Sequence, residues 1–200
     1  MSNLTKSLHD KFVYTRRMDL LSDIIGRQLQ NGAKVLDVGC GDGKIDKLIM
    51  QKKEVDIYGV DVLIRDETYI PVTKYDGELL PYEDNAFDAI LFIDVLHHIK
   101  NPIDILKEAK RVARDRIIIK DHLLKGLFAY STLKFMDYFG NAHYGVELPY
   151  NYLHKNEWDQ CFSDLSLTIK EHKIKLNLYP FPFNLIFDRH LHFVANLSIE

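Results

Sequence analysis

Residues 35–43 read Val-Leu-Asp-Val-Gly-Cys-Gly-Asp-Gly. The apolar start of this stretch is typical of a strand buried on both faces of a parallel sheet. Three glycines at every second position then let the backbone turn sharply and leave no Cβ atoms between it and a ligand. Residues 44–51 follow with apolar side chains at a helical spacing. We therefore expect a strand, a glycine turn and a helix, which is the first half of a nucleotide-binding βαβ unit.

The glycine spacing differs from that of a dinucleotide-binding turn. The dinucleotide pattern is G-x-G-x-x-G, and the helix that follows it receives a pyrophosphate. Here the pattern is G-x-G-x-G, with Asp37 before the turn and Asp42 within it. Two carboxylates would repel a phosphate but suit a ligand with an ammonium or sulfonium group. Cys40 lies inside the turn, where we interpret it as a small residue packed at the strand end.

The stretch resembles motif I of the class I S-adenosylmethionine-dependent methyltransferases, and further elements match in order over residues 30–120. The predicted second strand, residues 54–61, ends at Asp61, which can accept hydrogen bonds from both ribose hydroxyls. The resemblance implies that Asp76 accepts from the adenine amino group and that Gly77 lets the ring pass. The alternative for these two residues is an ordinary Asp-Gly turn.

The rest of the chain completes an α/β fold. We expect strands at residues 69–75, 87–93, 115–120, 166–178 and 190–199, with a helix after Asn101-Pro102 and another at residues 155–162. The expected fold is a Rossmann-like, doubly wound sheet of seven strands, mostly parallel with a reversed last strand. Residues 1–200 form one domain in this prediction.

Residues 123–154 are predicted to be a substrate-cap insertion in that domain. Six of the fourteen residues at 126–139 are aromatic or Met. We expect this segment to cover an apolar substrate or to contact a membrane surface. An ordinary core helix is the alternative.

Candidate catalytic residues follow the fourth and fifth strands and lie in the insertion. If the acceptor is a hydroxyl, a base is useful, and imidazole titrates near neutrality. His98, His122 and His143 are the candidates, and Asp121 could orient one of them. Of the adjacent pair His97 and His98 we expect one to be structural, because neighbouring residues at a helix start point in different directions.

The resemblance also gives a set of cofactor-binding residues. An N-terminal helix often covers the cofactor's carboxylate in this family, so Arg17 could reach it, although a solvated helix face is an equal alternative. The full set of expected cofactor-binding residues is Asp37, Gly39, Cys40, Gly41, Asp61, Val62, Asp76, Gly77, Asp94 and Arg17.

We expect no resident metal ion. Asp94, His98, Asp121 and His122 could be drawn as ligands, as in O-methyltransferases that use a divalent ion. However, no pair has a dedicated metal spacing such as H-E-x-x-H or C-x-x-C.

Composition limits the class of partner. The chain has 200 residues and a net charge of −3, so it carries no basic field that would indicate nucleic acid. It shows no secretory signal and no apolar stretch long enough to span a bilayer, and its two cysteines are typical of reduced thiols. A cytoplasmic location is therefore expected.

The predicted activity is methyl transfer from S-adenosyl-L-methionine, with S-adenosyl-L-homocysteine as the product. The expected acceptor is small, apolar or lipid-like, free or carrier-bound, and methylated on oxygen. The open alternatives are carbon methylation, a protein or RNA methyltransferase, and a non-catalytic cofactor-binding subunit. The residues after the fourth strand, Asp94-Val95-Leu96-His97, lack an Asn-Pro-Pro-Tyr type motif, which argues against methylation of amino groups on adenine or glutamine.

Overall fold

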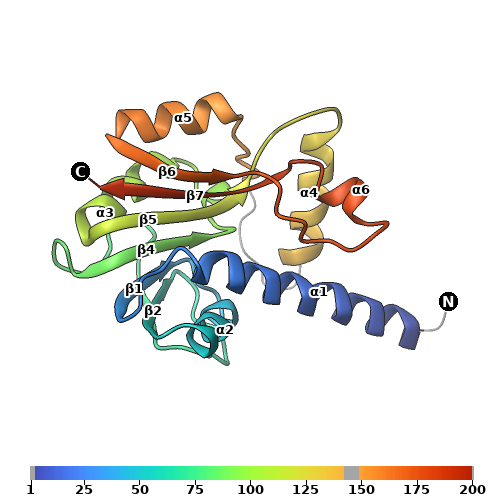
Figure 1. The fold of residues 1–200 in the computed structure, drawn as a ribbon, viewed down its shortest axis with the longest axis horizontal. Coiled ribbons are helices and arrows are strands. Elements are labelled where there is room, and N and C mark those ends of the chain that lie inside the picture. The colour runs from blue at the N-terminus through green and yellow to red at the C-terminus, as the bar shows by residue number, and fades with distance from the viewer. Residues whose placement is uncertain (1–2, 142–148, 200) are drawn as a thin grey trace.

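A computed structural model describes residues 3–141 and 149–199 (Figure 1). Its centre is a seven-stranded sheet in the order β3-β2-β1-β4-β5-β7-β6. The strands are β1 (Ala33–Val38), β2 (Val55–Asp61), β3 (Val72–Lys74), β4 (Phe87–Ile93), β5 (Ala113–His122), β6 (Leu167–Lys173) and β7 (His192–Ile199). β7 pairs antiparallel with both β5 and β6, and the other pairs are parallel. The expected fold class and its reversed last strand are confirmed.

The helices lie on both faces of the sheet and beside one end of it. They are α1 (Asn3–Gly26), α2 (Lys44–Lys52), α3 (Pro102–Val112), α4 (Ala129–Asn141), α5 (Lys155–Asp164) and α6 (Asn184–Phe187), with a 3₁₀ turn, η1, at Leu96–His98. Buried side chains of α3 and α5, such as Leu106 and Trp158, form one core layer. Leu21 and Ile25 of α1 and Ile49 of α2 belong to the other.

The strand order reverses between β1 and β4. In a doubly wound sheet, the crevice outside the carboxyl ends of the strands at this point is the usual ligand site. The glycine turn after β1 and η1 after β4 therefore flank the crevice. β4 begins and ends where the apolar run of the sequence predicted. Five of its seven residues are buried, as expected of a central strand.

Several predicted boundaries were wrong. β3 has three residues, because pairing with β2 extends only from Gly59 to Asp61. β6 ends at Lys173, five residues before the predicted end at residue 178. β5 is longer than predicted, because its pairing with β7 continues to His122 opposite His192. Asp121 and His122 are thus strand residues.

The predicted cap contains α4, while its residues 142–148 lie outside the described part of the chain. Figure 1 shows α4 and α6 beside the end of the sheet from which α1 projects. Leu133 is buried with Tyr152, whereas Phe128 and Tyr138 are exposed. The segment thus combines exposed apolar side chains with a small buried cluster that also includes Leu191. Among the described residues, no helix is long and apolar enough to cross a membrane.

Candidate functional site

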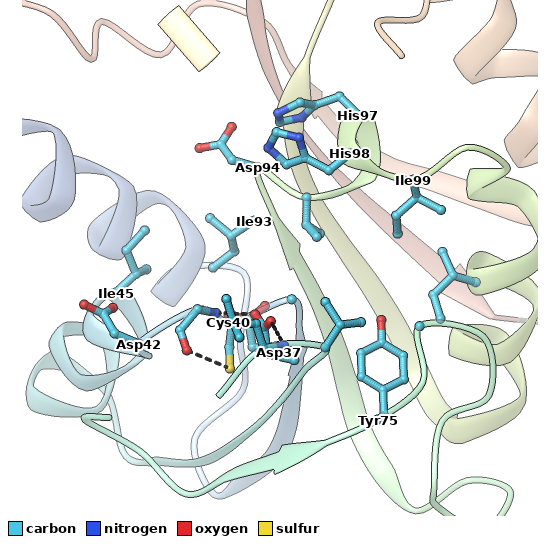
Figure 2. A pocket seen from close by; sticks show the side chains of 18 of the residues that line it. Asp37, Cys40, Asp42, Ile45, Tyr75, Ile93, Asp94, His97, His98 and Ile99 are labelled. Atoms are coloured by element: carbon cyan, nitrogen blue, oxygen red, sulfur yellow. Dashed lines mark hydrogen bonds between the residues drawn. The ribbon is translucent and has the colours of Figure 1, made fainter. Parts of the chain in front are cut away.

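A cavity of about 1900 Å³ opens at the carboxyl ends of the central strands. Figure 2 shows Asp37, Cys40 and Asp42 toward one end of it, and His97 and His98 toward the other, with Asp94 nearby. All ten residues expected to bind the cofactor line this cavity, as do His98 and His122. Asp121 is not among the lining residues.

The three glycines of the turn have different roles. All three adopt positive φ, between 60° and 75°. A Cβ on Gly39 would lie 2.3 Å from Val95 Cγ2, and one on Gly43 would lie 2.4 Å from Ile70 Cγ1. A Cβ on Gly41 would meet nothing within 4 Å, and this residue lines the cavity. Gly39 and Gly43 therefore permit close packing within the protein, and of these two only Gly39 also lines the cavity.

Asp61 holds the turn at the end of β2. Its Oδ2 accepts a hydrogen bond from Gly41 N at 2.8 Å, and its Oδ1 accepts from Leu63 N at 2.9 Å. Each carboxylate oxygen can accept a second hydrogen bond. Asp61 can therefore bind a ligand hydroxyl while it positions the Gly41 backbone.

Asp76 forms the Asp-Gly turn that was the alternative for this position. Its Oδ1 accepts from Glu78 N at 2.8 Å and from Leu79 N at 2.9 Å. These backbone hydrogen bonds lower the pKa of its carboxyl. Because Asp76 and Gly77 also line the cavity, the turn and an adenine contact are compatible.

Asp37 lies against a second buried carboxyl, Asp46, in the first turn of α2. Burial, together with the neighbouring Asp46, raises the pKa of Asp37 well above its ordinary value. Burial also raises the pKa of Asp46 to about 7. Sequence reasoning missed Asp46, because an acid in the first turn of a helix is ordinarily a solvated partner of the helix dipole.

A partly buried ion cluster lies where β4 and β5 end, and Lys120 is its fully buried member. Arg17 donates to Asp94 Oδ2, and Lys120 donates to Asp94 Oδ1. Burial alone would raise the pKa of Asp94, but the charges of Lys120 and Arg17 outweigh it and hold that pKa well below its ordinary value. In this structure the predicted carboxylate-binding Arg17 is thus paired with a side chain of the protein. Lys120, the lysine that ends the run Ile-Ile-Ile, was not among the predicted site residues.

The histidines beyond Asp94 form one cluster. The His97 and His98 ring centroids are 4.0 Å apart, and those of His97 and His122 are 4.5 Å apart. The tight η1 turn directs both adjacent imidazoles to the same place, so the expectation that they diverge was wrong. Asp121 Oδ1 lies 2.6 Å from His97 Nδ1, and Asp121 Oδ2 accepts from Leu96 N at 2.9 Å. Asp121 therefore orients His97, which was not one of the histidines predicted to act as the base.

His98 and His122 are neutral imidazoles near pH 7. Burial, reinforced by the charge of His97, lowers the pKa of His98 to about 4 and lowers that of His122. For His97, burial is outweighed by the Asp121 and Asp137 carboxylates, which raise its pKa to about 10. The third predicted base, His143, lies outside the described residues.

Asp137 of α4 was not predicted. Its Oδ2 lies 3.3 Å from His97 Nε2, and its Oδ1 lies 3.5 Å from His122 Nε2. The Tyr152 hydroxyl donates to Oδ2 of the same carboxylate. The neighbouring Asn151 N donates to the His97 carbonyl at 3.0 Å, which anchors the end of the cap segment to η1. A single acid in an aromatic stretch gave little signal in the sequence.

The cavity residues fit an adenosyl group joined to a cationic chain. Gly41 leaves room for close backbone approach, and Asp61 retains acceptor capacity for hydroxyls. Asp37 Oδ1 is buried and has no hydrogen-bond partner among the described residues. A nucleoside with a positive sulfur or amino group would suit these acceptors better than a phosphate.

Comparison with known proteins agrees with this geometry. A profile of the family described as "Methyltransferase domain" matches residues 9–172. Methyltransferase GfsG of Streptomyces halstedii is 32% identical over 110 residues, covering 48% of this chain and 40% of that protein. The 27-O-demethylrifamycin SV methyltransferase of Amycolatopsis mediterranei is 29% identical over 125 residues, covering 55% of this chain and 45% of that protein. The matches thus span less than half the length of these two curated relatives.

A solved structure shares the fold over nearly the whole chain. It is a SAM-dependent methyltransferase from Aquifex aeolicus, with a TM-score of 0.62 and 18% identity. The alignment covers 97% of this chain and 98% of that one.

Proposed function

Because the chain belongs to the class I S-adenosylmethionine-dependent methyltransferases, we propose that it transfers a methyl group to a hydroxyl of a small, apolar acceptor. S-Adenosylmethionine supplies the methyl group on a sulfonium, whose departure as a thioether requires no proton. The protein must therefore align the acceptor and exclude water, and positioning of this kind can supply about 7–11 kcal/mol.

We assign the cofactor to the end of the cavity formed by the glycine turn and β2. Asp61 would accept hydrogen bonds from the ribose hydroxyls. Because Gly41 has no side chain, the nucleoside could approach its backbone closely. Asp76 and Gly77 would border the adenine. The buried carboxyl of Asp37 lies beneath the turn, and its Oδ1 offers the ligand an acceptor.

The acceptor would bind toward the histidine cluster. The observation that carries this assignment is the pair of neutral imidazoles, His98 and His122, lining the same cavity as the glycine turn. A neutral imidazole can take the proton of a hydroxyl as the oxygen–carbon bond forms and the sulfur–carbon bond breaks. General bases of this kind typically contribute about 10²–10⁴-fold in rate.

An apolar acceptor agrees with Met136 of α4, which lines the cavity. Leu127 and Phe128, just before α4, are 77% and 69% exposed but are not among the lining residues. The name of the Amycolatopsis relative describes methyl transfer to an O-demethylated rifamycin, which favours oxygen as the methylated atom. Methylation of carbon is the alternative, and a carbon acceptor could bind in the same cavity.

The test is transfer of a labelled methyl group from S-adenosylmethionine to a panel of apolar phenols, long-chain alcohols and prenyl compounds. Mass spectrometry and NMR of the product would distinguish oxygen from carbon. We expect His98→Ala and His122→Ala to lower turnover while binding of S-adenosylhomocysteine persists. His190→Asn is the matched control, because His190 is exposed, has a φ of 62° that Asn tolerates, and is not among the cavity residues. Unchanged turnover in both cavity variants would overturn the imidazole assignment.

A further inference from the structure

We propose that His97, His98 and Asp137 form a binding site for a divalent transition-metal ion in the wall of the cavity. This departs from the expectation, based on sequence spacing, that the chain holds no metal. The three residues come from two elements, η1 and α4, that the fold brings together beside the cavity.

The ligand atoms are close to the required geometry. One atom from each of the three side chains lies within 4.8 Å of the other two. Zinc binds imidazole nitrogen and carboxylate oxygen at about 2.0–2.2 Å, so two ligands of one ion lie at most about 4.4 Å apart. His97 Nε2 and Asp137 Oδ2 already lie 3.3 Å apart.

In the described part of the chain, the nitrogens that would bind the ion have no partner outside the proposed ligand set. Among the described residues, His97 Nε2 and His98 Nδ1 are buried atoms without a hydrogen-bond partner. A buried polar atom left unpaired ordinarily destabilises the folded protein. A proton on His97 would pair that ring with Asp137, but it leaves the adjacent His98 nitrogen unsatisfied. A shared cation satisfies both rings at once.

The surroundings resemble the outer shell of a metal site. In metal-bound histidines the N–H of the other ring nitrogen usually donates a hydrogen bond to a carboxylate or carbonyl, which fixes the tautomer. His97 Nδ1 lies 2.6 Å from buried Asp121, so Nε2 remains as the ligand atom. The Tyr152 hydroxyl donates a hydrogen bond to Asp137 Oδ2 and so orients the carboxylate that would bind the ion.

The donor set indicates the class of ion. Two imidazoles and one carboxylate suit zinc, iron(II) and similar divalent ions, whereas calcium and magnesium prefer oxygen alone. Three protein ligands leave a coordination position for an outside group. His97, His98 and Asp137 all line the cavity, so that position is open to a bound acceptor.

A catalytic consequence rests on the proposed function. A divalent ion held by these residues would lower the pKa of a hydroxyl bound to it, which would favour its deprotonation before methyl transfer. Metal binding itself does not depend on this step.

The experiment begins with protein treated with a chelator and dialysed. Calorimetry with Zn²⁺ and the visible absorption of the Co²⁺ form would measure binding. We expect one equivalent of Zn²⁺ and a Co²⁺ spectrum typical of four or five ligands. Asp121→Asn should weaken Zn²⁺ binding by about 10–100-fold, and His98→Gln and Asp137→Asn by at least as much. His190→Asn should bind as the wild type does.

Zinc-edge X-ray absorption on the loaded wild-type protein needs no variant. It should show two imidazole nitrogens per zinc. Absence of stoichiometric binding, a zinc shell without two imidazoles, or wild-type affinity in folded His98→Gln and Asp137→Asn would overturn the proposal. Binding of S-adenosylhomocysteine to the metal-free protein is measured in parallel. Loss of S-adenosylhomocysteine binding would count against the proposed function, whereas the metal-site proposal would still be judged by the Zn²⁺ measurements.

Discussion

Replacing Gly39 and Gly41 separately by Ala separates the two reasons for glycine in the turn. At Gly39 the new Cβ would lie 2.3 Å from Val95 Cγ2, at a φ of 75°. The left-handed conformation costs a non-glycine residue about 1–2 kcal/mol, and overpacking typically adds about 1–3 kcal/mol. Gly39→Ala should therefore lower the free energy of unfolding by about 2–5 kcal/mol.

Gly41→Ala is the matched variant, because its φ is 60° but its Cβ would meet nothing within 4 Å. Only the conformational cost of about 1–2 kcal/mol applies to its stability. The new methyl group would instead occupy the cavity beside Asp61. We expect affinity for S-adenosylhomocysteine to fall at least about tenfold, which corresponds to about 1.4 kcal/mol.

Urea unfolding gives the two stabilities, and calorimetry gives the affinity of each folded variant. At this chain length each kcal/mol corresponds to about 2–4 °C in the midpoint of thermal unfolding. The reasoning is refuted if Gly39→Ala is as stable as the wild type, or if Gly41→Ala binds the ligand with unchanged affinity.

Two further predictions concern buried charges. Asp46 has a pKa of about 7 in the folded protein, against about 3.9 unfolded, so its contribution to stability is present below about pH 4 and is lost as the pH rises through 7. Asp46→Asn should therefore stabilise the protein by about 1–4 kcal/mol at pH 8 but hardly at pH 4. Asp56→Asn, at an exposed position, is the control and should change stability equally at both pH values. Equal effects of Asp46→Asn at pH 4 and pH 8 would exclude a raised pKa of Asp46. Asp94→Ala should cost about 3–5 kcal/mol in urea unfolding, because Arg17 and Lys120 lose their shared carboxylate, and a loss below about 1 kcal/mol would contradict the partly buried ion cluster.

Local pattern was sufficient for much of the fold. The apolar run and glycine turn predicted β1, the turn and α2, and the apolar run at Phe87–Ile93 predicted β4. These elements are specified by burial and backbone conformation along a short stretch of chain. The same stretch located the cavity, since every expected cofactor residue lines it.

The histidine end of the site could not be predicted in this way. Asp137 meets His97 from a helix 40 positions further along the chain, and no spacing rule connects them. The two adjacent imidazoles converge because η1 is a 3₁₀ turn, a conformation that its short sequence does not indicate. The partner of Asp121 likewise depends on how β5 packs against η1.

The most direct test of the central claim is calorimetric titration of the protein with S-adenosylhomocysteine, repeated with Asp61→Ala. The account predicts one binding site per chain in the wild type. It also predicts at least about a hundredfold weaker binding in the variant, since two hydrogen bonds to a charged group are worth about 3 kcal/mol or more. Folded wild-type protein that binds no ligand at millimolar concentration, or an Asp61→Ala variant with unchanged affinity, would contradict it.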